Sequence, residues 1–308
     1  MSIARSISGA AFAFAVSTAA WAADDNFDKD AALQTLETLA ADEMGGRAAG
    51  TDGNAKARDY LLERIKQAGY APVGPSFEHK FKFTPRLPTG AAEIIGTNLL
   101  FRIPGTGETG KTIVISAHYD HVGTRGGLIF NGADDNASGV AGALAIADAF
   151  ANQPPQNDVI FALFDAEEMG LQGARAFVRN REMIDPNIAF NINFDMLSRS
   201  DKNELYVAGV FHRPELKSVV ETVAAQAPVK LLMGHDDPAL GNNDWTFASD
   251  HGPFHRQGVP FLYFGVEDHP HYHQPSDVYE SIPVDFFLRS LETVVAAARE
   301  VDSYLAAE

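Results

Sequence analysis

Apolar segments that read as strands alternate with helical segments along most of the chain. Residues 112–117 (TIVISA) form a continuous apolar run rich in β-branched side chains, which is typical of a strand covered on both faces. The Ala-rich segment 137–152 has helical spacing instead. The pattern predicts strands over 112–117, 159–164, 188–194, 205–208 and 259–264, and helices over 30–39, 55–68, 137–152, 171–180, 215–227 and 284–305. This alternation predicts an α/β fold with a mostly parallel sheet and helices on both of its faces.

Two segments do not follow the alternating pattern. Residues 42–50 are rich in glycine and predict a loop. Residues 70–111 are punctuated by Pro and Gly and predict short strands and turns. The sequence contains no internal repeat, low-complexity tract or clear linker, so we expect residues 23–308 to form a single domain.

The first 22 residues have the pattern of a signal peptide. Arg5 provides the positive charge, residues 7–20 are mostly small and apolar, and Ala20-Trp21-Ala22 has the form of a cleavage site. The alternative is a short membrane anchor, but the apolar stretch falls short of the ~20 residues that span a bilayer. We therefore expect export to the periplasm or the medium, with no stable membrane association after cleavage.

Composition excludes several classes of function. The 308 residues include no cysteine, which excludes disulfides, thiolate nucleophiles, iron–sulfur clusters and cysteine zinc sites. Acidic residues outnumber basic ones by 41 to 24, and this balance argues against nucleic acid as a partner. The signal segment holds one basic and no acidic residue, so its removal changes the net charge from −17 to −18. No G-x-S-x-G motif offers a serine nucleophile.

Acidic residues and histidines cluster where the predicted strands end. Open α/β sheets bind ligands at the carboxyl ends of their strands. Taken alone, each cluster has an ordinary explanation as a surface turn, a helix cap or a solvated loop. The clusters are His118-Tyr-Asp120-His121, Asp134-Asp135, Asp165-Ala-Glu167-Glu168, Asn193-Phe-Asp195 and the His-rich tract His269-Pro-His271-Tyr-His273.

Together these clusters predict a metal centre. One His or carboxylate from each of the five forms a nitrogen and oxygen donor set suited to Zn²⁺. Two zinc ions would balance the charge of Asp135, Glu168, Asp195 and one bridging hydroxide, whereas the uncompensated acids would be costly to bury. Glu167 is then left without a metal, and a free carboxylate beside a metal-bound water is suited to act as a general base.

The motifs and their order closely resemble those of the co-catalytic di-zinc exopeptidases. This family includes bacterial secreted leucyl aminopeptidases and is related to glutamate carboxypeptidase and glutaminyl cyclase. The resemblance runs from the loop Asp42-Glu-Met-Gly-Gly-Arg47 to the end of the chain and includes Ser249-Asp250-His251. It implies a three-layer α/β/α sandwich around a mostly parallel mixed sheet.

The resemblance also implies a role for each matching residue. Asp135 would bridge two Zn²⁺ ions. His118 and Asp195 would hold one ion, and Glu168 and His273 would hold the other.

Three further roles follow from the same resemblance. Glu167 would be the general base, Asp120 would orient His118, and Tyr272 would stabilise the oxyanion. The chain departs from many relatives at Ser198, where they carry Gly before an Arg corresponding to Arg199, and we expect little effect on zinc.

The function that the resemblance implies is zinc-dependent hydrolysis of the N-terminal peptide bond of peptides with a free N-terminus. Alternatives on the same fold are a carboxypeptidase, a glutaminyl cyclase with a single zinc, or a non-catalytic receptor-like module. A carboxypeptidase needs a cation for the terminal carboxylate, a role open to Arg125, Arg199 or Arg256. The sequence makes no prediction of oligomeric state.

The remaining histidines have structural interpretations. His79, His212 and His235 lie outside the motifs and are expected at the surface or in packing. His251 and His255 are four residues apart, but Gly252 and Pro253 between them argue against a regular helical pair of ligands.

Overall fold

The computed structural model describes residues 27–85 and 92–308, which include all the predicted strands and helices. The predicted signal peptide, residues 1–22, lies outside the described residues. Within the described part of the chain, no helix is both long enough and apolar enough to cross a membrane.

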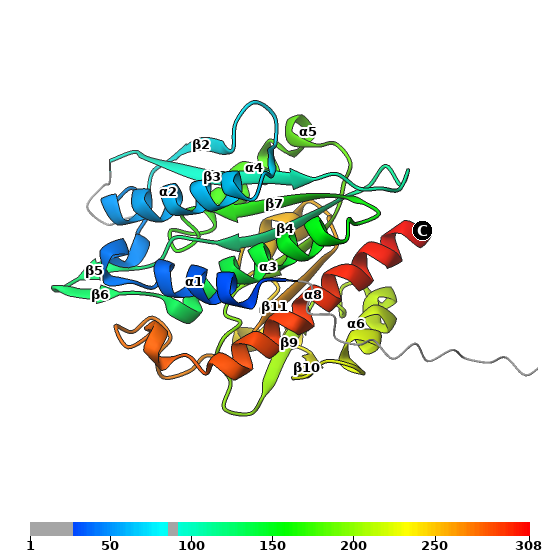
Figure 1. The fold of residues 1–308 in the computed structure, drawn as a ribbon. Helices are drawn as coiled ribbons and strands as arrows, with labels where there is room; N and C mark the ends of the chain where they lie inside the picture. The colour runs from blue at the N-terminus through cyan, green and yellow to red at the C-terminus, as the bar shows by residue number, and fades with distance from the viewer. Residues whose placement is uncertain (1–26, 86–91) are drawn as a thin grey trace, which may run out of the picture.

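A mixed sheet forms the middle layer of the fold (Figure 1). Strands β7, β4, β8 and β11 run parallel at its centre, and antiparallel pairs join β3 to β7 and β9 to β11. The order across the sheet is β1-β3-β7-β4-β8-β11-β9-β10, with β2 also paired to β3. The strands are β1 (Ala71–Pro72), β2 (Glu78–Phe83), β3 (Ile94–Ile103), β4 (Thr112–His118), β7 (Asp158–Phe164), β8 (Ile188–Phe194), β9 (Glu204–Ala208), β10 (Lys230–Met233) and β11 (Phe261–Gly265).

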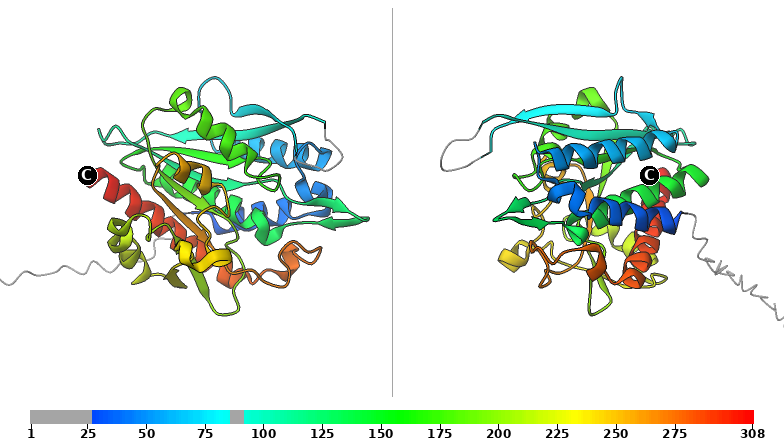
Figure 2. Two further views of the ribbon diagram at one scale, coloured as in Figure 1. Left: turned by 180° about the vertical axis from the view of Figure 1, so that it is seen from behind. Right: turned by 60° about the vertical axis from the view of Figure 1, so that its left-hand side comes forward.

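Helices cover both faces of this sheet, as Figures 1 and 2 show. The larger core lies beneath α1, α2, α3, α6 and α8, and a smaller core lies beneath α4 and α7 on the opposite face. The helices are α1 (Lys29–Leu39), α2 (Asp52–Gln67), α3 (Gly139–Asn152), α4 (Gln172–Arg179), α5 (Arg181–Ile184), α6 (Lys217–Ala224), α7 (His251–Arg256) and α8 (Val284–Ala307). The three-layer α/β/α fold expected from the sequence is confirmed.

Local sequence explains where the first two helices begin and end. The Asp28 carboxylate accepts a hydrogen bond from the Ala31 N–H and caps α1, and Thr51 caps α2 in the same way through the Asn54 N–H. Gly69 follows α2 with a φ of +78°, the left-handed conformation that glycine adopts most easily at a helix end.

The central strand β4 sets the position of the candidate chemistry. All seven of its residues are buried, in agreement with the apolar run that predicted it. Because β4 runs parallel to β7 on one side and β8 on the other, the carboxyl ends of all three strands meet at one edge of the sheet.

The sequence missed several smaller elements. A hairpin of β5 (Gly123–Arg125) and β6 (Leu128–Phe130) lies in a segment assigned no structure, and β3 is a ten-residue strand where short strands were expected. Gly252 and Pro253 do not interrupt a helix, because α7 spans them, but neither His251 nor His255 belongs to a group of candidate metal ligands within the described residues. Proline is tolerated there because the first turn of a helix needs no N–H donor.

Candidate metal centre

The candidate ligands come from loops at the carboxyl edge of the parallel strands. His118 is the last residue of β4, Asp195 directly follows β8, and Glu168 lies in the turn after β7. Asp135 lies in a wide helical turn before α3, and the peptide bond that follows it is cis. His273 lies in the loop between β11 and α8. Residues more than 150 positions apart in the sequence therefore meet at one point.

The first group of candidate ligands consists of His118, Asp135 and Asp195. His118 Nε2 lies 3.5 Å from Asp135 Oδ1 and 3.4 Å from Asp195 Oδ1. All three residues are buried.

The second group shares Asp135 and adds Glu168, His273 and His121. His273 Nε2 lies 3.0 Å from Asp135 Oδ2 and 3.3 Å from Glu168 Oε1. His121 Nδ1 lies 2.7 Å from Glu168 Oε1 and 3.7 Å from Asp135 Oδ2. Asp135 thus faces one group with each of its carboxylate oxygens.

His121 was missed as a candidate ligand by the sequence analysis. Its only sequence signal is its place three residues after His118, at the end of the same cluster. The other five candidate ligands are brought together as the motifs suggested.

The two groups fit a metal ion such as zinc. Zinc bonds to nitrogen and oxygen of about 2.0–2.2 Å place tetrahedral ligand atoms roughly 3.3–3.5 Å apart. The separations between the candidate ligand atoms, from 2.7 to 3.7 Å, lie on both sides of that range. Within the described part of the chain, His118 Nε2, His121 Nδ1 and Glu168 Oε1 are buried and have no hydrogen-bond partner of acceptable geometry. Because such orphaned polar atoms are costly, a cation between them would remove the cost.

The pKa shifts of the candidate ligands also favour a cation at this site. Burial raises the pKa of Asp135, and the nearby Glu168 carboxylate raises it further. Burial would also raise the pKa of Glu168, but its contacts with His121 and His273 lower it. The contacts of His273 with Asp135 and Glu168 raise the pKa of His273 to about 10. The raised pKa values of Asp135 and His273 mean that these side chains hold protons more tightly than usual. A divalent cation would compensate the charge of the carboxylates in place of those protons, so metal binding would release protons.

Asp120 connects the loop after β4 to the turn after β7. Its buried carboxylate accepts hydrogen bonds from the backbone N–H of Glu167 at 2.9 Å and of Glu168 at 3.3 Å. Its Oδ1 is 3.7 Å from His118 Nδ1, whereas its backbone carbonyl oxygen is 3.2 Å from the same nitrogen. The closest contact of Asp120 with His118 is therefore through the backbone, and its carboxylate positions the turn that carries Glu167.

A cavity of about 330 Å³ opens beside the candidate ligands. Glu167 and Tyr272 line it, and the Tyr272 ring stacks on His273 with centroids 4.0 Å apart. Burial raises the pKa of both Glu167 and Tyr272. The remaining walls are the candidate ligands Asp135, Glu168, Asp195 and His273, the residues Gly170 and Asp268, and the largely apolar side chains Leu171, Met196, Trp245, Ala248, Tyr263 and Val266.

Asp134 joins three of the loops that carry candidate ligands. Its fully buried carboxylate accepts hydrogen bonds from Ser198 Oγ at 2.7 Å and from the Ser198 N–H at 2.7 Å, and it contacts His269 Nε2 at 2.9 Å. In return, Asp277 accepts hydrogen bonds from the backbone N–H groups of Asp134 and Asp135. The loops that carry Asp135, Asp195 and His273 are therefore tied to one another through buried hydrogen bonds.

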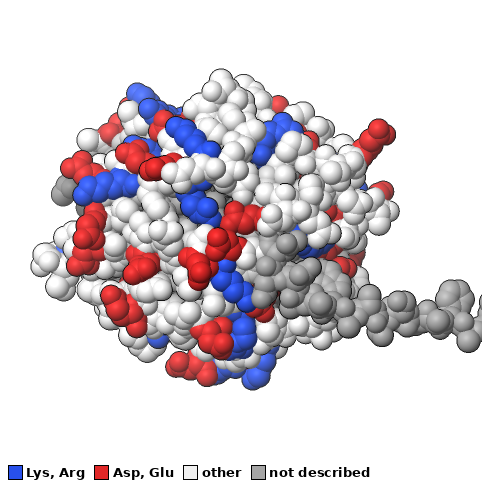
Figure 3. All heavy atoms as spheres, in the orientation of Figure 1, with Lys and Arg blue, Asp and Glu red and all other residues white. Residues whose placement is uncertain are grey.

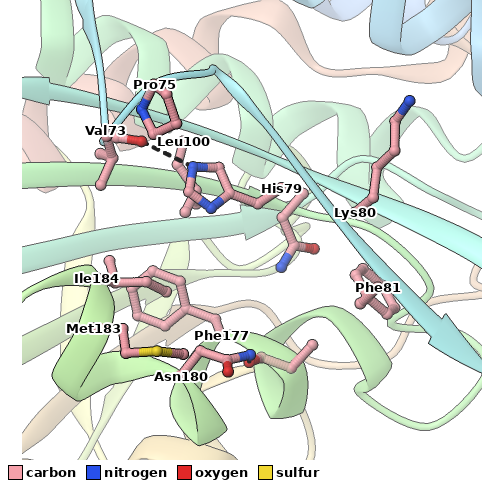
Figure 4. A pocket seen from close by; sticks show the side chains of 13 residues that line it. Val73, Pro75, His79, Lys80, Phe81, Leu100, Phe177, Asn180, Met183 and Ile184 are labelled. Carbon is pink, nitrogen blue, oxygen red and sulfur yellow. Dashed lines mark hydrogen bonds between the residues drawn. The ribbon is translucent and has the colours of Figure 1, made fainter.

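The histidines assigned to packing lie outside both groups. The His235 ring stacks on Trp245 with centroids 3.7 Å apart, and His212 Nε2 contacts Thr246 Oγ1 at 2.8 Å. His79 lies at a second cavity of about 390 Å³ between β2 and α4–α5, where its Nε2 is 2.9 Å from the Val73 carbonyl oxygen (Figure 4). Acidic and basic side chains are interspersed on the face shown in Figure 3.

Solved structures with a similar fold include two enzymes. A zinc aminopeptidase from Bacillus subtilis has a TM-score of 0.71 and 18% identity, with 89% of this chain and 95% of that chain covered. A glutaminyl cyclase from Bacteroides thetaiotaomicron has a TM-score of 0.68 and 18% identity, with 88% and 97% covered. At these identities the likeness shows the fold.

Two curated relatives align with most of this chain. Leupeptin-inactivating enzyme 1 of Streptomyces exfoliatus is 28% identical over 231 residues, which are 74% of this chain and 46% of that protein. Aminopeptidase YwaD of Bacillus subtilis is 28% identical over 197 residues, which are 61% of this chain and 40% of that protein. The aligned region is thus less than half the length of either relative.

A family model matches the region that contains the candidate centre. The model of peptidase family M28 matches residues 98–298, from β3 to the last helix, and includes all the candidate ligands. The family expected from the motifs is confirmed: the chain belongs to peptidase family M28.

Proposed function

We propose that this protein is a zinc-dependent aminopeptidase that hydrolyses the N-terminal peptide bond of peptides. One observation carries the proposal: two groups of candidate metal ligands share Asp135, and members of both groups line one cavity together with Glu167 and Tyr272. Membership of a peptidase family supports the reaction class, and the name of the Bacillus relative supports the aminopeptidase assignment.

Five residues would hold the metal in this proposal. His118, Asp135 and Asp195 would bind one zinc, and Asp135, Glu168 and His273 would bind the second. Bound zinc lowers the pKa of a water molecule and polarises a carbonyl group.

Glu167 is the proposed general base. Burial raises its pKa, which brings a carboxylate toward the range where it both accepts and returns a proton at neutral pH. The hydrogen bond from its N–H to Asp120 fixes the turn that carries it. Glu167 would take a proton from the attacking water and deliver it to the leaving amine.

Tyr272 is the proposed oxyanion donor. Burial and the neighbouring carboxylates of Asp135 and Asp195 raise its pKa, so its hydroxyl keeps the proton that it donates. A donor already aimed at the developing charge needs no reorganisation during the reaction.

The charge of the cavity favours an aminopeptidase over a carboxypeptidase. Among the described residues that line it, none is Lys or Arg, so the lining gives no support to Arg125, Arg199 or Arg256 as the cation that a terminal carboxylate needs. Carboxylates, including Asp268 at the wall, suit the positively charged α-amine of a peptide.

The pattern of residues 1–22, outside the described part of the chain, supports export to the periplasm or the medium. The absence of a linker in the sequence supports a single domain over residues 23–308.

A substrate panel with two variants tests the proposal. Free aminoacyl anilides should be cleaved and N-acetylated ones should not, with two zinc ions bound per chain. Glu167→Gln should keep both zinc ions and lower kcat by at least about 100-fold, since general-base catalysis contributes roughly 10²–10⁴. Glu182→Gln, an exposed change on α5, should leave kcat unchanged. Full activity of Glu167→Gln would contradict the assigned base. Release of C-terminal residues, or cyclisation of an N-terminal glutamine without peptide cleavage, would point to an alternative activity.

A further inference from the structure

The buried imidazole of His121 has a place in the second group that the five-ligand scheme does not use. We propose that His121 is a protein ligand of the second metal ion, so that this ion has four protein ligands: His121, Asp135, Glu168 and His273. The inference rests on the proposed two-metal function and adds to it an asymmetry between the two metal positions.

His121 Nδ1 lies close to carboxylate oxygens of two other members of the second group. Its Nδ1 lies 2.7 Å from Glu168 Oε1 and 3.7 Å from Asp135 Oδ2. One atom from each of the four residues lies within 4.8 Å of all the others. The four nitrogen–oxygen separations in this group, 2.7, 3.0, 3.3 and 3.7 Å, lie on either side of the roughly 3.3–3.5 Å edge of a tetrahedron of ligand atoms around zinc.

A simple hydrogen bond between His121 and Glu168 accounts poorly for the contact. Although the two atoms are 2.7 Å apart, neither completes a hydrogen bond of acceptable geometry within the described part of the chain. His121 is 1% exposed, so water does not replace the missing partner. A cation between His121 Nδ1 and Glu168 Oε1 would give both of these buried atoms a partner.

The surrounding backbone is shaped to admit the His121 ring. Gly132 has a φ of +59°, and a Cβ atom there would lie 2.5 Å from Cγ and Cδ2 of the imidazole. Arg47 donates hydrogen bonds to the carbonyl oxygens of Tyr119 and Gly132, and so holds together the two segments that enclose the ring. The position of His121 is thus fixed by its neighbours.

The fourth ligand has a consequence for the proposed chemistry. Zinc with four protein ligands is typical of a closed site, whereas zinc with three keeps a position open. The first group has three protein ligands, His118, Asp135 and Asp195. The open position therefore belongs to the ion beside His118, and the ion beside His121 is the more tightly held of the two.

The test compares wild type with His121→Asn and His271→Asn. The Asn amide nitrogen lies near the position of Nδ1, so Asn keeps a donor toward Glu168 but is a poor zinc ligand. His271 is in the same loop as His273, where its Nδ1 contacts Ser276 and its ring lies tilted against that of His269. Each metal-free protein is titrated with Zn²⁺ against a competing chelator, and with Co²⁺ to record the visible spectrum of each site. A crystal structure of the zinc-loaded wild type completes the set.

Loss of His121 should weaken only the second zinc. We expect its affinity to fall at least 100-fold, the upper end of what a residue behind a ligand costs, and the cobalt spectrum of that site to change. His271→Asn should match wild type, and the crystal structure should place His121 Nδ1 about 2.1 Å from zinc.

Three results would overturn the inference. If wild type binds two zinc ions with His121 away from both, or if His121→Asn binds both ions with unchanged affinity and spectrum, His121 is not a ligand and the two-metal function stands. If wild type does not bind a second zinc, both the inference and the proposed two-metal function fail.

Discussion

Replacing Arg47 by methionine should destabilise the protein strongly, and more so without zinc. The Arg47 side chain is completely buried and donates hydrogen bonds to the backbone carbonyls of Leu39, Tyr119, Asn131 and Gly132. Methionine has similar length but no donor. The variant therefore leaves these carbonyls without the guanidinium while the core remains filled.

The size of the effect follows from the contacts. Each buried carbonyl that loses its partner costs roughly 1–3 kcal/mol. The guanidinium's own burial, which lowers the pKa of Arg47 to about 10, costs several kcal/mol that the variant recovers. The net loss should be about 3–5 kcal/mol of unfolding free energy, as found when one partner of a buried charged contact is removed.

Zinc should reduce this loss. The positive charge of Arg47 acts on the carboxylates of Asp135, Asp120, Asp277 and Glu168, which attract it in turn. A bound metal ion would compensate two of these carboxylates itself, so the penalty for losing Arg47 should be smaller in the zinc-loaded protein.

Urea unfolding with chelator and with zinc measures both effects. Arg102→Met is the matched control, because Arg102 pairs with Asp158 at 3.3 Å in a partly exposed position and should contribute about 1 kcal/mol or less. If Arg47→Met unfolded at the same urea concentration as Arg102→Met, the carbonyl contacts would not stabilise the fold as argued. If adding zinc did not reduce the loss of unfolding free energy caused by Arg47→Met, the argument that Arg47 stabilises the nearby carboxylates would be wrong.

Two further variants test buried polar groups around the centre. Ser198→Gly removes the hydrogen bond from the hydroxyl to Asp134 but keeps the one from the backbone N–H, so we expect the free energy of unfolding in urea to fall by about 1–2 kcal/mol. The zinc affinity should stay within tenfold of wild type. A larger change in zinc affinity would show that the hydroxyl positions a ligand. Burial lowers the pKa of His251 to about 4, below the ~6.5 of a histidine in an unfolded chain. Between these two pH values the unfolded chain binds a proton at His251 that the folded chain does not bind. The free energy of unfolding therefore falls as the pH drops from about 6.5 to 4. His251→Gln keeps a donor for the Trp245 carbonyl but does not titrate, and should remove up to ~3 kcal/mol of that fall; an unchanged pH dependence of unfolding would refute the assignment.

The core of the fold was predictable because its signal is local. The run at 112–117 is apolar throughout, and β4 is buried along its full length. The segments 159–164 and 188–194 carry the same signal, and they became the neighbours of β4 in the sheet. The segment before β4 was harder to predict because β3 is defined by its antiparallel pairing with β7, a partner more than 50 residues away.

The sequence by itself determined the chemistry of the candidate centre but not all its members. A carboxylate or histidine placed directly after a buried parallel strand must reach the same edge of the sheet as its neighbours, and this rule was sufficient for His118, Glu168 and Asp195. The family resemblance, and not strand position, placed Asp135 between the two groups. Only the tertiary structure decided that His121 faces Glu168, because this contact depends on how separate loops approach one another. The role of Arg47 is likewise visible only in the fold, since its partners are backbone carbonyls, which no side-chain pattern in a sequence reveals.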